Sequence, residues 1–186
     1  VYLPDGDYLV YAVQGPEFSV ETSALKVRDG KNTTLRIDVP KRVLTTPHHM
    51  SVDMHVHASP STDNSFSTEK RVRTFVAERG EVMVGSEHDT IFDFNPLLRK
   101  LGVTDKMIAV TGSEVTSSLK TARAPYSIGH MNFFPLEEHS HANRRGLKAH
   151  ENRRTRDVLH DMHVHYNDPV AQLNRPRANF ALSHEL

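Results

Sequence analysis

The chain has 186 residues, a length that allows one domain or one domain with a small appendage. Its 23 basic and 23 acidic side chains cancel, which removes the simplest argument for binding to nucleic acid or to an anionic membrane surface. Cysteine is absent, so disulfide bonds, thiolate zinc sites and cysteine nucleophiles are excluded.

The first 40 residues predict β structure. Asp7–Val13 is a strand-like run, and Ala24–Arg28 and Thr33–Val39 flank the turn-like tetrapeptide Asp29-Gly30-Lys31-Asn32. Gly and Asn tolerate a positive φ, so we expect a hairpin around this tetrapeptide. The segment is too short to bury much of a core, and we expect residues 1–45 to form a small antiparallel accessory module.

From Ser51 onward, strand-like and helix-like segments alternate. We expect strands at Val52–His57, Glu81–Gly85, Met107–Thr111, His130–Phe134 and Val170–Leu173, and helices at Thr68–Arg79, Asn95–Leu101 and within Glu151–His165. This alternation favours an α/β fold with a parallel sheet or barrel in residues 46–186. Residues 137–156 are rich in His and Arg, so we expect a surface excursion there.

The pentapeptide Asp53-Met54-His55-Val56-His57 is the first segment with chemical content. Histidine, of which the chain has 13 copies, is the commonest metal ligand. Residues two apart on a strand share a face, so Asp53, His55 and His57 project together. Two such imidazoles can chelate one divalent cation, while a nearby carboxylate orients a ring by accepting its second N–H. The competing interpretation is a solvated strand face.

The same pentapeptide occurs again at Asp161–His165, in a segment that predicts a helix. On a helix, His163 and His165 lie roughly 200° apart and cannot share a metal ion. We therefore expect this second copy to be exposed and separated from His55.

Further metal-binding side chains lie near the predicted strand ends. They are Glu87 and His88 after Glu81–Gly85, Glu114 after Met107–Thr111, His130 beside Gly129, and Asp63 in the polar loop after His57. Ligands and catalytic groups collect at the carboxyl ends of parallel strands. A single residue of this kind is usually structural, but the recurrence along successive strand units indicates one shared site.

In their order, Asp53–His57, Asp63, Ser86-Glu87-His88, Gly112-Ser113-Glu114 and Gly129-His130-Met131-Asn132 resemble the motifs of the polymerase-and-histidinol-phosphatase (PHP) superfamily, and most of all its carbaryl-hydrolase-like branch. The resemblance covers roughly residues 51–177. It implies an α/β fold, a distorted (βα)7 barrel of which residues 46–186 would hold the N-terminal portion. Members of this branch often carry an N-terminal β module like residues 1–45.

The resemblance also implies a site with two or three divalent metal ions (Zn, Mn or Fe). By motif position, His55 and His57 would bind the first ion, Glu114 would bridge to a second ion that His130 also holds, and Asp63 and His88 would bind the third. Three carboxylates would serve catalysis beside these ligands. Asp53 would orient a ligand, and Glu87 or Asp89 would relay protons.

The chain departs from the PHP pattern in three places. Glu87 replaces the usual Asp before His88, and one extra methylene should have little effect. Arg175 stands where the superfamily commonly has a histidine ligand, and a guanidinium cannot coordinate a cation. The last Asp-x-His motif has no counterpart before Leu186. We therefore expect a fragment, a truncated product or a decayed relative that binds at least one ion fewer and turns over slowly or not at all.

Two functions fit these observations. The first is a hydrolase that uses a metal-activated water on a small-molecule phosphoester, or on a carbamate or amide. The alternative is a degenerate, non-catalytic metal-binding or binding-module protein. Nucleic-acid binding through residues 139–165, which hold six Arg or Lys and three acids, is less favoured than a solvated face.

Neither a membrane nor a nucleic acid is therefore an expected partner, and the sequence does not indicate an oligomeric state. No stretch approaches the roughly 18 uninterrupted apolar residues of a spanning helix, and no signal peptide is recognisable. The compartment stays open between an extracytoplasmic (secreted or periplasmic) and a cytoplasmic location.

Overall fold

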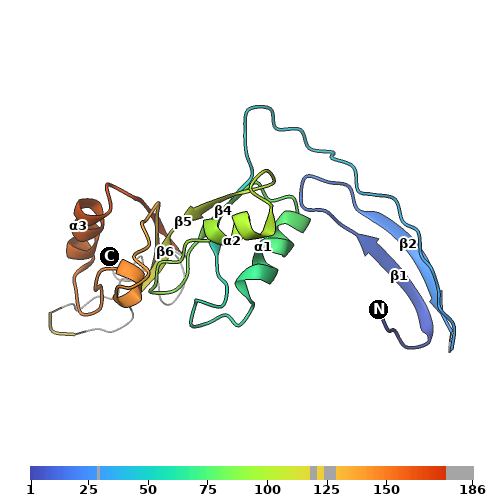
Figure 1. The fold of residues 1–186 in the computed structure, drawn as a ribbon, viewed down its shortest axis with the longest axis horizontal. Helices are drawn as coiled ribbons and strands as arrows, with labels where there is room; N and C mark the ends of the chain where they lie inside the picture. Colours follow the sequence, from blue (N-terminus) through green and yellow to red (C-terminus); the bar gives the residue numbers. More distant parts are fainter. Residues whose placement is uncertain (29, 118–120, 124–128, 175–186) are drawn as a thin grey trace. The chain divides into compact units, whose positions relative to one another are not determined.

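The computed structural model of the chain describes residues 1–28, 30–117, 121–123 and 129–174 (Figure 1). The chain divides into two compact units. The first comprises Val1–Met50 with Ala77–Arg79, and the second comprises Ser51–Val76 with Gly80–Leu186. No helix within the described ranges is long and apolar enough to cross a membrane.

The first unit is built on an antiparallel pair of strands, β1 (Gly6–Ala12) and β2 (Glu21–Val27). Half-buried and exposed residues alternate along both strands, as the two-residue period of a strand requires. The register places Tyr8 opposite Leu25, an aromatic–aliphatic cross-strand pair.

The predicted hairpin across Gly30 is therefore wrong. Thr33–Val39 forms no strand, and β2 pairs back to β1. Turn-forming residues at Gly30 do not by themselves decide which strands pair, and β2 pairs over its whole length with β1. Asp29, the first residue of the predicted turn, lies outside the described residues.

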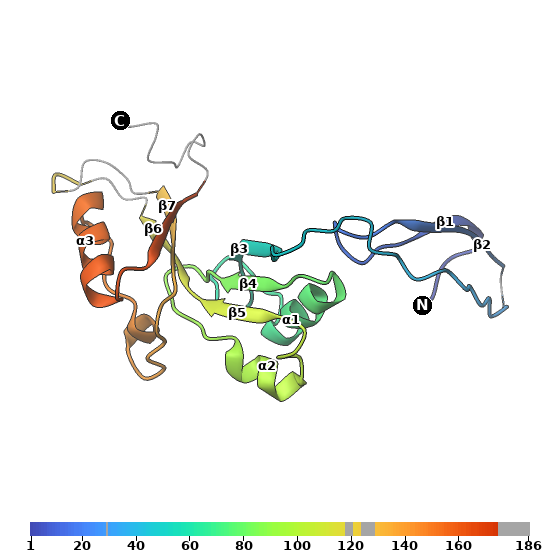
Figure 2. The same ribbon diagram turned by 90° about the horizontal axis from the view of Figure 1, so that it is seen from above.

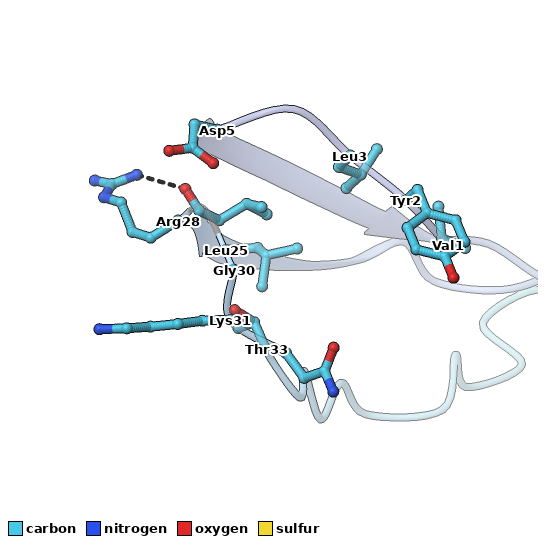
Figure 3. Close-up of a pocket in the computed structure, with 11 residues that line it drawn as sticks. Val1, Tyr2, Leu3, Asp5, Leu25, Arg28, Gly30, Lys31 and Thr33 are labelled. Carbon is cyan, nitrogen blue, oxygen red and sulfur yellow. Dashed lines mark hydrogen bonds between the residues drawn. The ribbon is translucent and has the colours of Figure 1, made fainter.

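A hollow of about 630 Å³ lies in this unit, beside the start of the chain (Figure 3). Tyr2, Leu25 and Arg28 are among the residues that line it, and the Arg28 guanidinium donates to the carbonyl oxygen of Val27 at 2.8 Å. None of the predicted site residues lines the hollow, so it contributes nothing to the predicted metal site.

The second unit begins with a parallel sheet in the order β3-β4-β5, whose strands are connected by two helices (Figure 2). The strands are β3 (Val52–Val56), β4 (Val82–Gly85) and β5 (Ile108–Thr111), and the helices are α1 (Thr68–Ala77) and α2 (Asn95–Leu101). Val72 of α1 and Leu98 of α2 pack with Met83 of β4 in one apolar cluster. The predicted strand–helix alternation is confirmed for this part of the chain.

The local signals of α2 explain why its bounds match the prediction. Pro96 lies in the first turn, where its missing N–H is not needed, and Gly102 ends the helix with a φ of 65°. Buried Leu98 anchors the helix to the apolar cluster.

The rest of the unit is an antiparallel sheet in the order β6-β7-β8, which differs from the parallel sheet or barrel that the sequence predicts. Its strands are β6 (Ser113–Ser117), β7 (Gly129–Phe134) and β8 (Val170–Leu173), accompanied by the 3-10 helix η1 (Asn143–Gly146) and the helix α3 (Thr155–His165). The fold is thus mixed α/β, and the described residues do not form a closed barrel.

Gly112 explains how the chain passes from one sheet to the other. A Cβ atom at this position would lie 2.8 Å from the Phe133 carbonyl oxygen and 3.1 Å from that of Gly85. Glycine therefore lets β5 and β6 meet beside both neighbouring backbones. The sequence interpretation treated Gly112-Ser113-Glu114 as a strand end, whereas the structure makes it a junction between two sheets.

Val158 and Met162 of α3 pack with Val115 and Phe133 of the second sheet. The predicted surface excursion at 137–156 is largely exposed, as expected. Leu147 and His150 within it are nevertheless buried.

Candidate metal centre

The six side chains predicted as metal ligands lie together. They form three overlapping groups, within each of which the candidate ligand atoms lie within 4.8 Å of one another: His55 with His57 and Glu114, His57 with Asp63 and His88, and His88 with Glu114 and His130. Glu114, His57 and His88 each belong to two groups. The described residues can therefore hold a metal ion at this place, and the shared members suit bridging positions.

The fold brings these residues together through two kinds of strand pairing. β3 and β4 run parallel, so His57 and His88 follow the ends of neighbouring strands. An isolated parallel bridge joins His88 to Glu114. His130 comes from the antiparallel pair β6–β7, where it lies opposite Thr116. It thus lies near the start of its strand and not at a carboxyl end.

The carboxylate of Glu114 is the centre of the cluster and is fully buried. Its Oε2 lies 3.0 Å from His55 Nε2, 2.9 Å from His57 Nε2 and 3.4 Å from His88 Nε2, and its Oε1 lies 3.2 Å from His130 Nδ1. Burial alone would raise the pKa of Glu114, but hydrogen bonds from His55 and Asn174 and the neighbouring His57 hold it far below the ordinary carboxyl range. The group is therefore an anion at neutral pH.

One ring nitrogen in the cluster is suited to hold a cation. His57 Nε2 is buried and, within the described residues, has no hydrogen-bond partner, although Glu114 Oε2 is close by. The other ring nitrogen, Nδ1, faces Ser61 Oγ at 3.0 Å and Asp63 Oδ1 at 3.2 Å. A buried polar atom without a partner is costly, and a cation between Nε2 and the carboxylate would satisfy both. A donor set of imidazoles and carboxylates fits Zn, Mn or Fe.

In the second ligand group, formed by His57, Asp63 and His88, the neighbouring carboxylates also shift the pKa of a histidine. Burial alone would lower the pKa of His57, but the carboxylates of Glu114 and Asp63 raise it above its ordinary value. Asp63 is itself exposed, and its Oδ2 lies 3.4 Å from His88 Nε2. The Asp63 carboxylate is therefore the solvent-exposed member of this ligand group.

Asp53, predicted to orient an imidazole, lies elsewhere. Its side chain is exposed and accepts a hydrogen bond from the main-chain N–H of His55 at 3.1 Å. This contact stays within one strand, and Asp53 belongs to none of the three ligand groups.

Glu87 is fully buried, and both of its carboxylate oxygens accept the N–H of Ala58 at 3.0 Å. Burial raises its pKa to about 7, although the Ala58 N–H opposes this shift. The contact secures the chain directly after His57. The carboxylate predicted as a proton relay is thus a main-chain anchor in the structure.

Asp89, the other predicted proton relay, accepts the N–H of Thr116 at 2.8 Å, and its Oδ1 lies 2.8 Å from His150 Nε2. Burial alone would raise its pKa, but these contacts with His150 and Thr116 lower it. It is an anion at neutral pH that faces the main chain and a buried ring.

Two asparagines that the sequence analysis did not single out as site residues support Glu114. Asn174 donates to Glu114 Oε1 at 2.9 Å and to Asn132 Oδ1 at 2.8 Å, and Asn132 donates to the Met54 carbonyl oxygen at 2.8 Å. The chain of amides fixes the carboxylate that the histidines surround. No spacing rule signals such a role, because Asn174 and Glu114 are 60 residues apart.

The second copy of the pentapeptide takes no part in the cluster. The prediction of a helix is confirmed, since Thr155–His165 is α3. His163 and His165 are exposed, and His163 Nδ1 lies 2.7 Å from the exposed Asp168. Arg175, predicted to stand at a ligand position, lies outside the described residues.

No model of a known protein family and no curated protein matches the chain. The resemblance to the PHP motifs therefore stays a prediction from the sequence. The interpretation of the site rests on its own geometry, which is compatible with metal binding.

Proposed function

We propose that this chain is a metal-dependent hydrolase of the PHP type that acts on a small-molecule phosphoester. The observation that carries the proposal is the buried Glu114 carboxylate, surrounded by four imidazoles, next to a His57 nitrogen that lacks a hydrogen-bond partner among the described residues. Divalent ions at such a centre polarise the bond to be broken and lower the pKa of a water.

The overlap of the three ligand groups supports a centre for more than one ion. Glu114 can serve two ions with its two oxygens, which face different histidines. His55 and His57 complete one position, and His130 with His88 completes another. Asp63 and His88 extend the cluster toward the exposed side.

The phosphoester is the preferred substrate class because the order of the motifs resembles the PHP superfamily. A carbamate or amide, which the carbaryl-hydrolase-like branch brings into consideration, needs the same ligand set. The chain's own contribution is to hold the cations and orient the imidazoles, while the solvent-exposed Asp63 marks the side from which we expect the substrate to enter.

A non-catalytic metal-binding protein is the second candidate, and one observation favours it. Both carboxylates predicted to relay protons are engaged elsewhere, Glu87 by the Ala58 N–H and Asp89 by the Thr116 N–H and the buried His150. On this alternative, the cluster would bind ions but would lack a proton-transfer group.

The two candidates separate in one experiment. The purified chain is stripped with a chelator, reloaded with Mn²⁺ or Zn²⁺, and assayed on an aryl phosphodiester and on an aryl carbamate. We expect slow hydrolysis of the phosphodiester that disappears with the chelator and returns with the ion, also in a His163→Ala control. Ion binding without turnover of either ester would support the non-catalytic alternative, and absence of ion binding would refute both.

A further inference from the structure

The hydroxyl of Thr116 lies between two of the imidazoles. Its Oγ1 is 2.8 Å from His88 Nδ1 and 3.2 Å from His130 Nδ1. A hydroxyl oxygen can accept a ring N–H from each side through its two lone pairs. For His88 this fixes the orientation of the ring, because its other nitrogen, Nε2, faces Glu114 and Asp63 at 3.4 Å.

The contact allows either tautomer of His88, because a hydroxyl both donates and accepts. With a cation on Nε2, Nδ1 must carry the proton. When Nδ1 carries the proton and donates to Thr116, Nε2 has its lone pair free toward the cluster. Partners of this kind orient the ring and raise its strength as a metal ligand. Thr116 itself belongs to none of the ligand groups among the described residues.

Thr116 is held in turn by Asp89. The Thr116 main-chain N–H donates to Asp89 Oδ1 at 2.8 Å, and the Asp89 N–H donates to the Glu114 carbonyl oxygen at 2.9 Å. Asp89 adopts a φ of 55°, a left-handed conformation that is uncommon for residues other than glycine. The position is thus fixed by contacts on both its side chain and its main chain.

His150 completes the arrangement from a distant part of the chain. Its ring is fully buried, with Nε2 2.8 Å from Asp89 Oδ1 and Nδ1 3.2 Å from the Lys148 carbonyl oxygen. Arg144 Nη1 lies 3.4 Å from the same Nε2, so the Asp89 carboxylate is the closer partner. A buried imidazole is tolerated when its nitrogens are paired.

We propose that His150, Asp89 and Thr116 form a positioning unit for the metal centre. His150 orients the Asp89 carboxylate, Asp89 fixes β6 at Thr116, and the Thr116 hydroxyl accepts the Nδ1–H of the metal-binding tautomer of His88. The inference rests on the proposed metal centre but not on hydrolysis. It assigns Asp89 a role other than the proton relay that the sequence suggests.

The test uses a matched pair at one position. Thr116→Val removes the hydroxyl but keeps the shape and the main-chain N–H, whereas Thr116→Ser keeps the hydroxyl. Two quantities are measured: the ring tautomers in ¹⁵N-histidine-labelled protein loaded with diamagnetic Zn²⁺ at roughly pH 8, above the ordinary imidazole pKa, and the dissociation constant for Mn²⁺. Neither readout depends on turnover.

We expect His88 to be the Nδ1–H tautomer in the natural chain and in Thr116→Ser, but only in part in Thr116→Val, because the ring there binds the cation less tightly. The Mn²⁺ dissociation constant should rise by about 10- to 100-fold in Thr116→Val and stay within about threefold in Thr116→Ser. His150→Phe, which keeps a ring but no nitrogen, should resemble Thr116→Val.

The inference is overturned if Thr116→Val and Thr116→Ser behave alike in either readout, or if His88 of the natural chain carries its proton on Nε2. The Thr116 pair decides the question even if His150→Phe does not fold. Loss of ester hydrolysis with both readouts as expected would refute the proposed hydrolase and leave the positioning unit intact.

Discussion

The pentapeptide Asp-Met-His-Val-His occurs twice in this chain, with opposite outcomes. At 53–57 it lies on and just after β3, and its two histidines contact the buried Glu114 carboxylate. At 161–165 it forms the end of α3, and its histidines are exposed. Because the five residues are identical, the difference must come from the residues that the fold places beside each copy. Only the first copy lies beside the buried Glu114 carboxylate.

The two copies differ in which of their apolar residues is buried: the valine in the first copy and the methionine in the second. On the strand, Val56 is 6% exposed and Met54 is 45% exposed, whereas on the helix Met162 is 1% exposed and Val164 is 57% exposed. Residues alternate sides along a strand, while a helix buries residues four apart, here Val158 and Met162. The flanking sequence therefore selects which side of the pentapeptide is buried.

The largest expected effect comes from removing the charge of the Glu114 carboxylate, which only the first copy of the pentapeptide faces. Glu114→Gln keeps the size of the side chain but removes the charge next to four imidazoles. Partners of metal ligands are typically worth about 10- to 100-fold in metal affinity, so we expect the loss of the central charge to lower Mn²⁺ or Zn²⁺ affinity by at least about 100-fold. Titration calorimetry checks this, with the exposed Glu137→Gln as control. Unchanged affinity in Glu114→Gln would remove the centre of the account.

The opposite burial of Met162 and Met54 predicts a smaller effect, a difference in the free energy of unfolding. Met162→Ala should lower the free energy of unfolding by about 2–4 kcal/mol, because it opens a cavity in the cluster around Val115 and Phe133. Met54→Ala, at the matching position of the first copy, should change it by less than about 0.5 kcal/mol. Urea unfolding of the metal-free protein measures both, and equal losses would contradict the assigned burial.

Replacing Asn174 tests whether its hydrogen bonds support Glu114. We expect an effect of intermediate size on the free energy of unfolding. Asn174→Leu removes two donated hydrogen bonds. Asn132 Oδ1 loses this donor, while Glu114 Oε1 keeps the His130 imidazole beside it. Each such loss costs about 1–3 kcal/mol, and we expect a decrease of that size in the free energy of unfolding. Chemical denaturation at neutral pH reports it. A neutral result would show that the amides do not fix the carboxylate.

The smallest effect concerns the aspartates that open the two copies. Asp161 forms an ion pair with Arg153, whose hydrogen bond lowers the pKa of the carboxyl. A lowered pKa in the folded protein means that the pair stabilises above the ordinary carboxyl pKa of about 4 and that this stabilisation is lost as the pH falls through the folded pKa.

Asp161→Asn should therefore cost about 0.2–1 kcal/mol at neutral pH, and this cost should shrink as the pH falls through the folded carboxyl pKa. Asp53→Asn, where the side chain accepts only its own strand's N–H within the described contacts, should cost less at neutral pH. Thermal melts across this pH range measure the difference. A cost for Asp161→Asn that does not change with pH would exclude the ion pair as its source.

Local signals made much of the fold predictable. The bounds of α2 follow from Pro96 and Gly102, and the sequence also predicts β8 with its observed bounds. Sheet direction was not predictable in this way, because the change from parallel to antiparallel occurs at Gly112 and depends on the Gly85 and Phe133 backbones. The hairpin predicted at Gly30 is wrong because turn residues alone do not decide pairing, and β2 pairs with the preceding strand β1.

For the site, residue type and strand placement predicted which six side chains would gather. Their roles as ligands stay predictions. Asn174, Thr116 and His150 were not predictable, because they act through contacts with residues far away in the sequence. Asp53 shares a strand face with His55 but accepts the main-chain N–H of that residue, so a shared face does not by itself bring a carboxylate to a ring.

The most direct test of the central claim is the metal content of two matched variants, His57→Ala in the first copy and His165→Ala in the second. Each protein is dialysed against Mn²⁺ or Zn²⁺, freed of excess ion, and analysed by mass spectrometry of the metal. The account predicts that His165→Ala retains as much ion per chain as the natural sequence, while His57→Ala loses at least half. Equal metal content in the two variants, or a greater loss in His165→Ala, would contradict it.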